Sequence, residues 1–389
     1  MKLVQFIILF FLSLGCLFVV PTAQAADLDI TYQMVMDAPM QVSYRATMTR
    51  QRYNVDGDTT FRSSQHIIHQ YPDRDRLDIP VAEGRQSTVV IRIKDDVYRR
   101  KASGDTLYYS HRHQRGTDVL DIGLGFSSLD LIQTNYHLEN TGSDQVMNRS
   151  AAILTFNPRH PGRLTKKAWI DEETGLVLRT EDRDESGSLV EELYFTNLQV
   201  NPHLKADLFD TKEWEGRAVE SRQVIACGSV NEVQNEAGFA LSAPVYVPAG
   251  FTLEHRRVIQ YYGQPLVHFM YTDGLAQLSL FQRLTSSSNE AAKAWPDGAP
   301  VRRGNIEVWQ DDTYSIFRLN KGGKLFTLVG SITETESINL LESLCVITPS
   351  AASIDQTSVL GMPSWVVIGG GFGLLLLGVG AIWRRRTMI

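Results

Sequence analysis

The sequence has few cysteines and none of the short motifs that accompany enzymatic chemistry. Its 389 residues include three cysteines, and no two of them stand in a CxxC. GxSxG, P-loop, GxGxxG and HExxH patterns are absent, so the usual arrangements for activating a serine, cradling a phosphate or holding catalytic zinc are missing. The sequence therefore predicts a binding protein without catalytic residues or cofactor. An envelope enzyme stays open, because a missing motif is weaker evidence than one that is present.

Metal-ligand spacing is equally scarce. His111 and His113 would share one face of a predicted strand, but no carboxylate or third histidine lies nearby in the sequence. The acidic run at 182–187 begins like a calcium loop, yet Leu193 stands where such a loop needs its bidentate glutamate. We predict no metal site, and we interpret 182–187 as a hairpin turn.

Positive charge is sparse in the body of the chain. Between residues 26 and 362, 34 basic side chains stand against 44 acidic ones, which gives a formal charge of −10 before histidines. An acidic body is a poor partner for a phosphate backbone, so the sequence predicts no nucleic-acid binding.

The two chain ends predict export and membrane anchoring. Residues 1–25 combine Lys2, a long apolar run and an A-x-A site, the pattern of a cleaved signal peptide. An uncleaved anchor and lipidation at Cys16 are the alternatives. Residues 364–383 carry no charge and match the thickness of a bilayer core, which predicts a transmembrane helix at 363–383.

The arginines that follow this span set its orientation. Arg384, Arg385 and Arg386 predict a cytoplasmic tail at 384–389 under the positive-inside rule, and hence a periplasmic body anchored in the inner membrane. A sorting signal that a protease removes is the alternative. Gly369 and Gly373 form a GxxxG, which would allow a homo-oligomer, although glycines are also common in single spans.

The two remaining cysteines predict a disulfide. Cys227 and Cys345 form an even pair in a chain predicted to be exported. A bridge between them would close a loop of about 120 residues and stabilise the fold by about 5 kcal/mol at most. We therefore expect the pair to fasten the base of a second domain.

Alternating apolar residues predict one large sheet in the first half of the chain. At 41–48, Val42, Tyr44, Ala46 and Met48 alternate with polar residues, the period of a half-buried strand. Similar strands follow at 87–100, 105–111, 136–140, 151–158, 166–171, 176–182 and 189–200. Helices are predicted at 27–38 and 124–132, and Gly175 closes a hairpin between 166–171 and 176–182. The fold class is α+β, mostly antiparallel β, with a curved sheet and covering helices.

A smaller β-rich domain follows. Strand patterns recur between residues 243 and 332, and Thr333 with Glu336 forms a capping box that opens one helix, which Cys345 ends. The predicted division is a signal peptide at 1–25, a large domain at 26–215, a linker at 216–226, a small domain at 227–346, a stalk at 347–362, the transmembrane helix at 363–383 and the tail at 384–389.

Several stretches of the sequence resemble the MucB/RseB family of sigma-E regulatory proteins. The run 151–202 contains "WID-x-x-TGL-x-LR", a "D-x-x-G" turn at 184–187 and the closing "FTNLQVNP". The second half adds "VPAGF" at 247–251 and "YTDGLAQLSLF" at 271–281. The resemblance covers most of 28–345, and the related carriers LolA and LolB share the hairpin signature. The second domain favours MucB/RseB.

This resemblance implies a LolA-like half-barrel that senses lipophilic molecules and a small domain that helps to bind the periplasmic part of an anti-sigma factor. The bound regulator would shield that factor from proteolysis until a lipid, lipopolysaccharide or lipoprotein acyl chain releases it. A membrane-tethered lipid or lipoprotein carrier, with the same cavity and no anti-sigma partner, is the alternative. Family members are mostly soluble in the periplasm, so the predicted anchor is a departure.

Candidate site residues follow from the alternation. A pocket would be lined by the apolar residues that we expect to point inward, namely Val42, Tyr44, Ala46, Met48, Val89, Ile91, Ile93, Leu154, Phe156, Ala168 and Ile170. In the second domain, Tyr271 and Leu275 on the 271–281 hairpin are the candidates for a partner surface.

Overall fold

The computed structural model describes the two β-rich parts of the chain. Described residues are 32–80, 87–100, 106–111, 128–214, 218–221, 224–261, 264–285, 299–310, 315–330 and 332–347. The predicted signal peptide, transmembrane helix, tail and all of the stalk after Ile347 lie outside them. Within these ranges, no helix is both long and apolar enough to span a bilayer.

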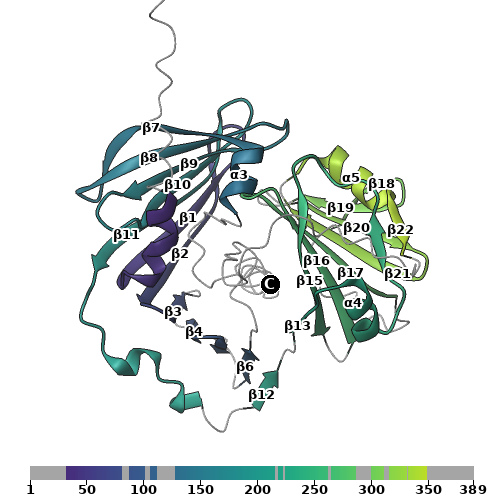
Figure 1. Ribbon diagram of the computed structural model, residues 1–389, viewed down its shortest axis with the longest axis horizontal. Coiled ribbons are helices and arrows are strands. Elements are labelled where there is room, and N and C mark those ends of the chain that lie inside the picture. The colour runs from purple at the N-terminus through teal and green to yellow at the C-terminus, as the bar shows by residue number, and fades with distance from the viewer. Residues whose placement is uncertain are drawn as a thin grey trace, which may run out of the picture.

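The first sheet has twelve strands in the order β12-β6-β5-β4-β3-β2-β1-β11-β10-β9-β8-β7. They are β1 (Tyr44–Tyr53), β2 (Thr59–Gln70), β3 (Arg74–Ile79), β4 (Thr88–Ile93), β5 (Asp96–Arg100), β6 (Thr106–His111), β7 (Tyr136–Val146), β8 (Arg149–Pro158), β9 (Thr165–Asp171), β10 (Val177–Arg183), β11 (Leu189–Val200) and β12 (Ala218–Ser221). Every described pair is antiparallel except β6 with β12. Figure 1 shows a long curved layer from β7 to β12. The prediction of a mostly antiparallel curved sheet is confirmed.

The β9–β10 hairpin shows why these residues turn where they do. Asp171 accepts hydrogen bonds from the backbone N–H and the hydroxyl of Thr174 through Oδ1, at 2.9 and 2.7 Å. Gly175 has φ +74°, and a Cβ there would collide with the carbonyl of Met34. Met34 belongs to a helical segment at 32–37. The glycine is therefore needed for the turn and for the close approach of that helix.

Two further elements complete the first part. Helix α3 (Leu129–Asn135) ends where β7 begins, and Ile132 packs with Tyr32 and Val35 from the 32–37 segment. The short 3-10 helices η1 (Ala38–Met40), η2 (Ala206–Phe209) and η3 (Lys212–Trp214) flank the sheet. Phe209 and Trp214 pack against the face opposite to α3, beside β2, β4 and β6.

The second sheet has eight strands in the order β13-β15-β16-β17-β21-β20-β19-β18. They are β13 (Val224–Ala226), β15 (Thr252–Tyr261), β16 (Gln264–Thr272), β17 (Gln277–Leu284), β18 (Val301–Arg303), β19 (Ile306–Gln310), β20 (Ser315–Lys321) and β21 (Lys324–Gly330), while β14 (Ser242–Pro244) pairs with β22 (Leu344–Val346). The predicted linker at 216–226 thus contains β12 and β13, each paired into one of the two sheets.

Helices α4 (Val230–Ala237) and α5 (Glu334–Glu342) cover one face of the second sheet. The predicted capping box of α5 is present, because the Thr333 hydroxyl accepts from the Glu336 N–H and the Glu336 carboxylate accepts from the Thr333 N–H. The helix ends at Glu342, earlier than predicted, because the next residues pair with β14 as β22.

The structure does not contain the predicted disulfide. Cys227 and Cys345 are both free thiols, the first buried and the second exposed. Cys227 lies in the core with α4, and its N–H donates to the Arg256 carbonyl. Cys345 lies on β22 opposite Ala243. The position of each cysteine is thus set by a different neighbouring strand, β15 for Cys227 and β14 for Cys345. The spacing of cysteines in the sequence gives no information about these contacts.

Candidate functional site

The structure divides the predicted pocket residues between two faces of the first sheet. Ala46 stands opposite Ile67, Ile67 opposite Leu77, and Leu77 opposite Val90. Residues paired directly share a face, so Val90 lies on the face of Ala46. Its neighbours Val89 and Ile91, with Ile93, lie on the other face beside Phe209 and Trp214. Because successive residues of a strand point to opposite faces, these three candidates are separated from the rest.

Seven of the candidates do share one face. Register connects Leu154 to Ala168, then to Thr180 and Leu193, and so to Arg50 on β1. The face defined in this way, which we call the helix-side face, carries Tyr44, Ala46, Met48, Leu154, Phe156, Ala168 and Ile170. Val42 precedes β1 and packs in the cluster of Tyr44 and Met48. All of these side chains are buried, so in this structure they are core.

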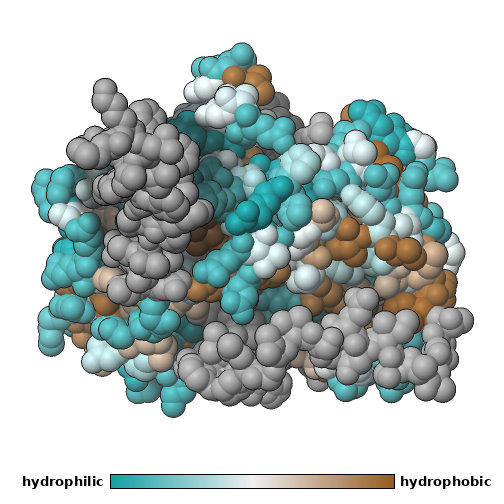
Figure 2. Space-filling model, turned by 45° about the horizontal axis from the view of Figure 1, so that its top comes forward, coloured by the Kyte–Doolittle hydropathy of each residue, from teal (hydrophilic) through white to brown (hydrophobic). Residues whose placement is uncertain are grey.

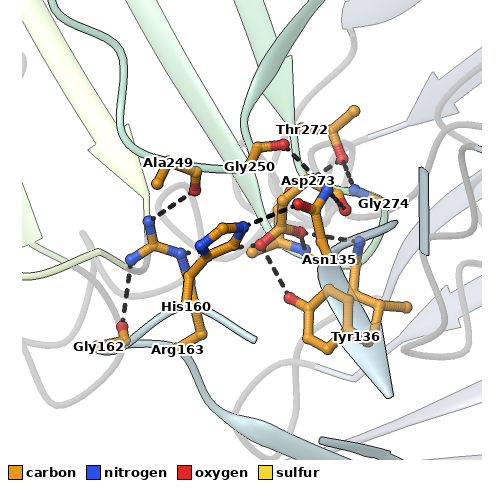
Figure 3. A network of polar contacts seen from close by, with 12 residues as sticks. Asn135, Tyr136, His160, Gly162, Arg163, Ala249, Gly250, Thr272, Asp273 and Gly274 are labelled. Carbon is orange, nitrogen blue, oxygen red and sulfur yellow. Dashed lines mark hydrogen bonds and ion pairs between the residues drawn. The ribbon is translucent and has the colours of Figure 1, made fainter. Parts of the chain in front are cut away.

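The two partner-surface candidates do not lie on a free surface. Tyr271 is buried at 4% exposure in the core of the second sheet. Leu275 packs against the cluster that contains Ile132 and Tyr136, which belongs to the first sheet and α3. Leu275 differs from the expectation because the 272–276 turn contacts the first part, whereas Tyr271 on β16 faces the core of its own sheet. This turn forms one side of a buried junction between the two parts of the protein (Figure 3).

Asp273 lies at the centre of this junction. Its side chain is 1% exposed, and its Oδ1 accepts from the N–H groups of Leu275 and Ala276 at 3.0 and 2.7 Å. The hydroxyl of Tyr136, at the start of β7, donates to Asp273 Oδ2 at 2.8 Å. Asp273 therefore shapes its own turn and binds the first sheet with the same carboxylate.

Asn135 crosses the junction from the end of α3. Its Nδ2 donates to the carbonyls of Gly250 and Asp273 at 3.0 and 2.9 Å, and His160 Nε2 lies 3.1 Å from its Oδ1. Gly250 (φ +87°) leaves no room for a side chain, since a Cβ there would lie 2.5 Å from Asn135 Oδ1. Gly274 (φ +107°) would likewise place a Cβ 2.7 Å from Ile132 Cγ1. Glycine is required at both turns for backbone conformation and for contact.

Arg163 enters the second part from the connection between β8 and β9. Its Nη1 and Nη2 donate to the two carboxylate oxygens of Glu336 at 2.8 and 2.9 Å. Its guanidinium lies 4.9 Å above the ring of Phe251, and its Nε is 3.8 Å from Asp273 Oδ2. Arg163 is 2% exposed. Removing one member of such a buried pair typically costs about 3–5 kcal/mol.

The junction also shifts the pKa values of its acids. Burial raises the pKa of Asp273, although hydrogen bonds from Ala276, Leu275 and Tyr136 oppose this rise. For Glu336, burial acts upward but is outweighed by Arg163, so its pKa is lowered. Burial and Asp273 raise the pKa of the Tyr136 hydroxyl. The described junction therefore holds charge and hydrogen bonds in a fixed arrangement suited to fastening two bodies.

The sequence shows the turns of this site but not what they contact. The stretches "VPAGF" and "YTDGL" supply Gly250, Asp273 and Gly274 to the junction. Their glycines signalled turns, but nothing in them indicated what the turns contact. Asn135 and Arg163 carried no such signal. The side chains of His111 and His113 lie outside the described residues.

Comparisons with known proteins concern both halves of the chain. The sequence model of the MucB/RseB N-terminal domain matches residues 33–213. The Haemophilus influenzae protein named sigma-E factor regulatory protein RseB is 23% identical over 207 residues, which are 53% of this chain and 58% of that protein. The Pseudomonas aeruginosa protein named sigma factor AlgU regulatory protein MucB is 24% identical over 282 residues, 69% of this chain and 78% of that protein.

Solved structures show the same fold across both sheets. MucB in complex with MucA(peri) matches with a TM-score of 0.55 at 19% identity, over 82% of this chain and 99% of that chain. MucB alone matches with a TM-score of 0.52 at 21% identity, over 82% and 98% of the two chains.

Proposed function

The chain belongs to the MucB/RseB family, and from this premise we propose that it is an extracytoplasmic regulator that binds the periplasmic segment of an anti-sigma factor. The observation that carries the proposal is the fold, which matches nearly the whole of a MucB chain solved with MucA(peri). A match that spans both sheets supports a function that needs both. We further propose that binding shields the segment from proteolysis, and that the protein acts by binding and not by catalysis.

A partner surface on the second part is proposed from exposed apolar side chains. Val245 is 78% exposed and Val346 is 60% exposed. Val346 ends β22 and Val245 directly follows its partner strand β14, and Tyr246 next to Val245 is 37% exposed. Figure 2 shows apolar side chains gathered on the part of the molecule that holds the second sheet. This surface replaces Tyr271 and Leu275 as our candidate contact with the anti-sigma segment.

A lipophilic ligand is proposed as the releasing signal. The helix-side face brings seven of the candidate apolar residues into one register across β1, β8 and β9, and such a face suits an acyl chain when the covering segments move. The same feature supports the second candidate function, a tethered lipid or lipoprotein carrier. An inner-membrane anchor at 363–383 would hold regulator and target in one plane and raise their effective concentration.

Capture of native partners tests the proposal. The tagged chain is cross-linked in membranes of the source organism, and bound proteins are identified. We expect a single-span protein with a cytoplasmic sigma-binding domain, displaced by its own purified periplasmic segment. Recovery of lipoproteins or outer-membrane assembly factors alone would support the carrier.

A pair of surface variants adds a control. Val346→Asp should reduce capture at least about tenfold, because a charge would enter an apolar contact. Val55→Asp, at a position 89% exposed in the turn between β1 and β2, should leave capture unchanged. Equal capture by both variants would remove this surface from the proposal.

A further inference from the structure

Arg163, in the connection between β8 and β9, binds the carboxylate of Glu336 in the first turn of α5. We propose that Arg163 is a latch that fixes the orientation of the second sheet relative to the first and couples that orientation to the first turn of α5. The proposal concerns the chain alone and does not depend on the identity of any partner.

The geometry distinguishes Arg163 from the other junction contacts. Asn135 binds backbone carbonyls of turns where a Cβ at Gly250 or Gly274 would collide with the first part. Tyr136 binds the Asp273 side chain, which is 1% exposed. Arg163 makes two hydrogen bonds to Glu336 and a longer one, of 3.4 Å, to the Ala249 carbonyl. The arginine is 2% exposed, whereas the Glu336 side chain is 18% exposed. The pair therefore reaches the solvent-accessible edge of the junction, where it can part without unpacking the turns.

The same carboxylate couples the latch to α5. Glu336 Oε2 accepts from Arg163 Nη1 at 2.8 Å, from the Thr333 hydroxyl at 3.0 Å and from the Thr333 N–H at 3.3 Å. The Thr333 hydroxyl oxygen in turn accepts from the Glu336 N–H at 3.2 Å. Gly162, next to Arg163, approaches Thr333 so closely that a Cβ there would lie 2.6 Å from Thr333 Cγ2. Withdrawing Arg163 therefore frees the acid to leave the capping box.

A purely stabilising role for Arg163 leads to a different expected result. If the ion pair only adds stability, its removal lowers the stability of the chain but leaves the two sheets in the same orientation. If it is a latch, its removal widens the range of orientations and exposes the first amides of α5. Relative motion of two bodies is the default when their interface is weakened.

Distance measurements between the two parts separate these roles. The full chain carries Cys16→Ser, Cys227→Ala and Val55→Cys, and spin labels are attached at position 55 and at the natural, exposed Cys345. We expect a narrow distance distribution, which roughly doubles in width in Arg163→Met. The matched control is Arg149→Met, which removes a comparable arginine that pairs with Asp171 and Glu173 inside the first sheet, and it should leave the width unchanged.

Hydrogen exchange supplies a second measurement. In Arg163→Met, the amide of Glu336 should exchange about fivefold faster, as expected when a helix loses its N-terminal cap. The α4 amides should be unaffected. An unchanged distance width in Arg163→Met would overturn the proposal whatever the exchange at Glu336, and unchanged exchange would overturn the coupling to α5. If Arg163→Met does not fold, Glu336→Gln repeats the test, since it keeps an acceptor for Thr333 but removes the charge. Unchanged width in that variant would also overturn the proposal.

Discussion

Replacing Tyr136 by phenylalanine removes one buried hydrogen bond of the junction and almost nothing else. The hydroxyl donates to Asp273 Oδ2 at 2.8 Å, and the residue is 2% exposed. A hydrogen bond to a charged group contributes about 1.5–3 kcal/mol, and its loss leaves a buried acceptor that water cannot reach. We therefore expect Tyr136→Phe to lower the free energy of unfolding by that amount, roughly a 12- to 160-fold change in the folding equilibrium.

The chain offers a matched control for this substitution. Tyr53 also donates its hydroxyl to a carboxylate, that of Glu192, at 3.0 Å. Both residues there are only partly buried, so water can replace the lost donor. We expect Tyr53→Phe to cost less than about 1 kcal/mol. Urea denaturation of both variants, followed by tryptophan fluorescence and fitted with a common m-value, measures the difference.

The cost of Tyr136→Phe should also depend on pH. Burial raises the pKa of Asp273, while the Tyr136 hydroxyl opposes that rise by stabilising the ionised carboxylate. A raised carboxyl pKa gives stability at low pH that is lost as the pH rises through the folded-state value. Without the hydroxyl this loss becomes larger, so the penalty should be greatest near neutral pH and shrink as the pH falls toward 4. A penalty no larger than that of Tyr53→Phe, or one independent of pH, would refute the assignment of this bond to an ionised Asp273.

Three further substitutions test separate parts of the structure. Gly250→Ala should destabilise the chain by about 1–3 kcal/mol more than Gly57→Ala. Both glycines have positive φ, but only a Cβ at 250 would meet Asn135 Oδ1, at 2.5 Å. Equal losses of stability in thermal melts would rule out the collision. Burial raises the pKa of Glu254 to about 7, so the free energy of unfolding should decline as the pH rises from about 4.5 to 7. Glu254→Gln should flatten this decline in urea titrations, and an unchanged pH dependence would contradict the assignment of the decline to Glu254. Thr333→Ala removes the hydroxyl that accepts from the first turn of α5 and should lower the free energy of unfolding by about 1 kcal/mol. Faster amide exchange should be confined to α5, and faster exchange across the second sheet would contradict a purely local role for Thr333.

Local rules were sufficient to predict many of the elements. The β9–β10 hairpin follows from Thr174 and Gly175, and the start of α5 follows from Thr333 and Glu336, because the deciding hydrogen bonds join residues within four positions of one another. Two separate β-rich sheets were likewise visible in the alternation. Resemblance to MucB/RseB came from the same short stretches.

The face of the sheet on which each apolar residue lies was only partly predictable. Alternation shows that Val89, Ile91 and Ile93 lie on one side of β4, but it does not say which side. That choice is made by pairing with β3, where Leu77 stands opposite Val90. The end of α5 differs from the prediction for a related reason, since β14 pairs with Leu344–Val346 and ends the helix early.

The sequence by itself determined the strands, the turns and the helix cap, because each depends on the conformation of a few adjacent residues. Only the tertiary structure decided the junction. Asn135 and Asp273 are 138 positions apart, and Arg163 and Glu336 are 173 apart. No local pattern records such a pairing, since a buried arginine and an exposed one look the same in the sequence. These contacts stabilise the protein strongly only when the two sheets exclude water between them. For that reason the contacts that hold the protein in one arrangement can be seen only in its three-dimensional structure.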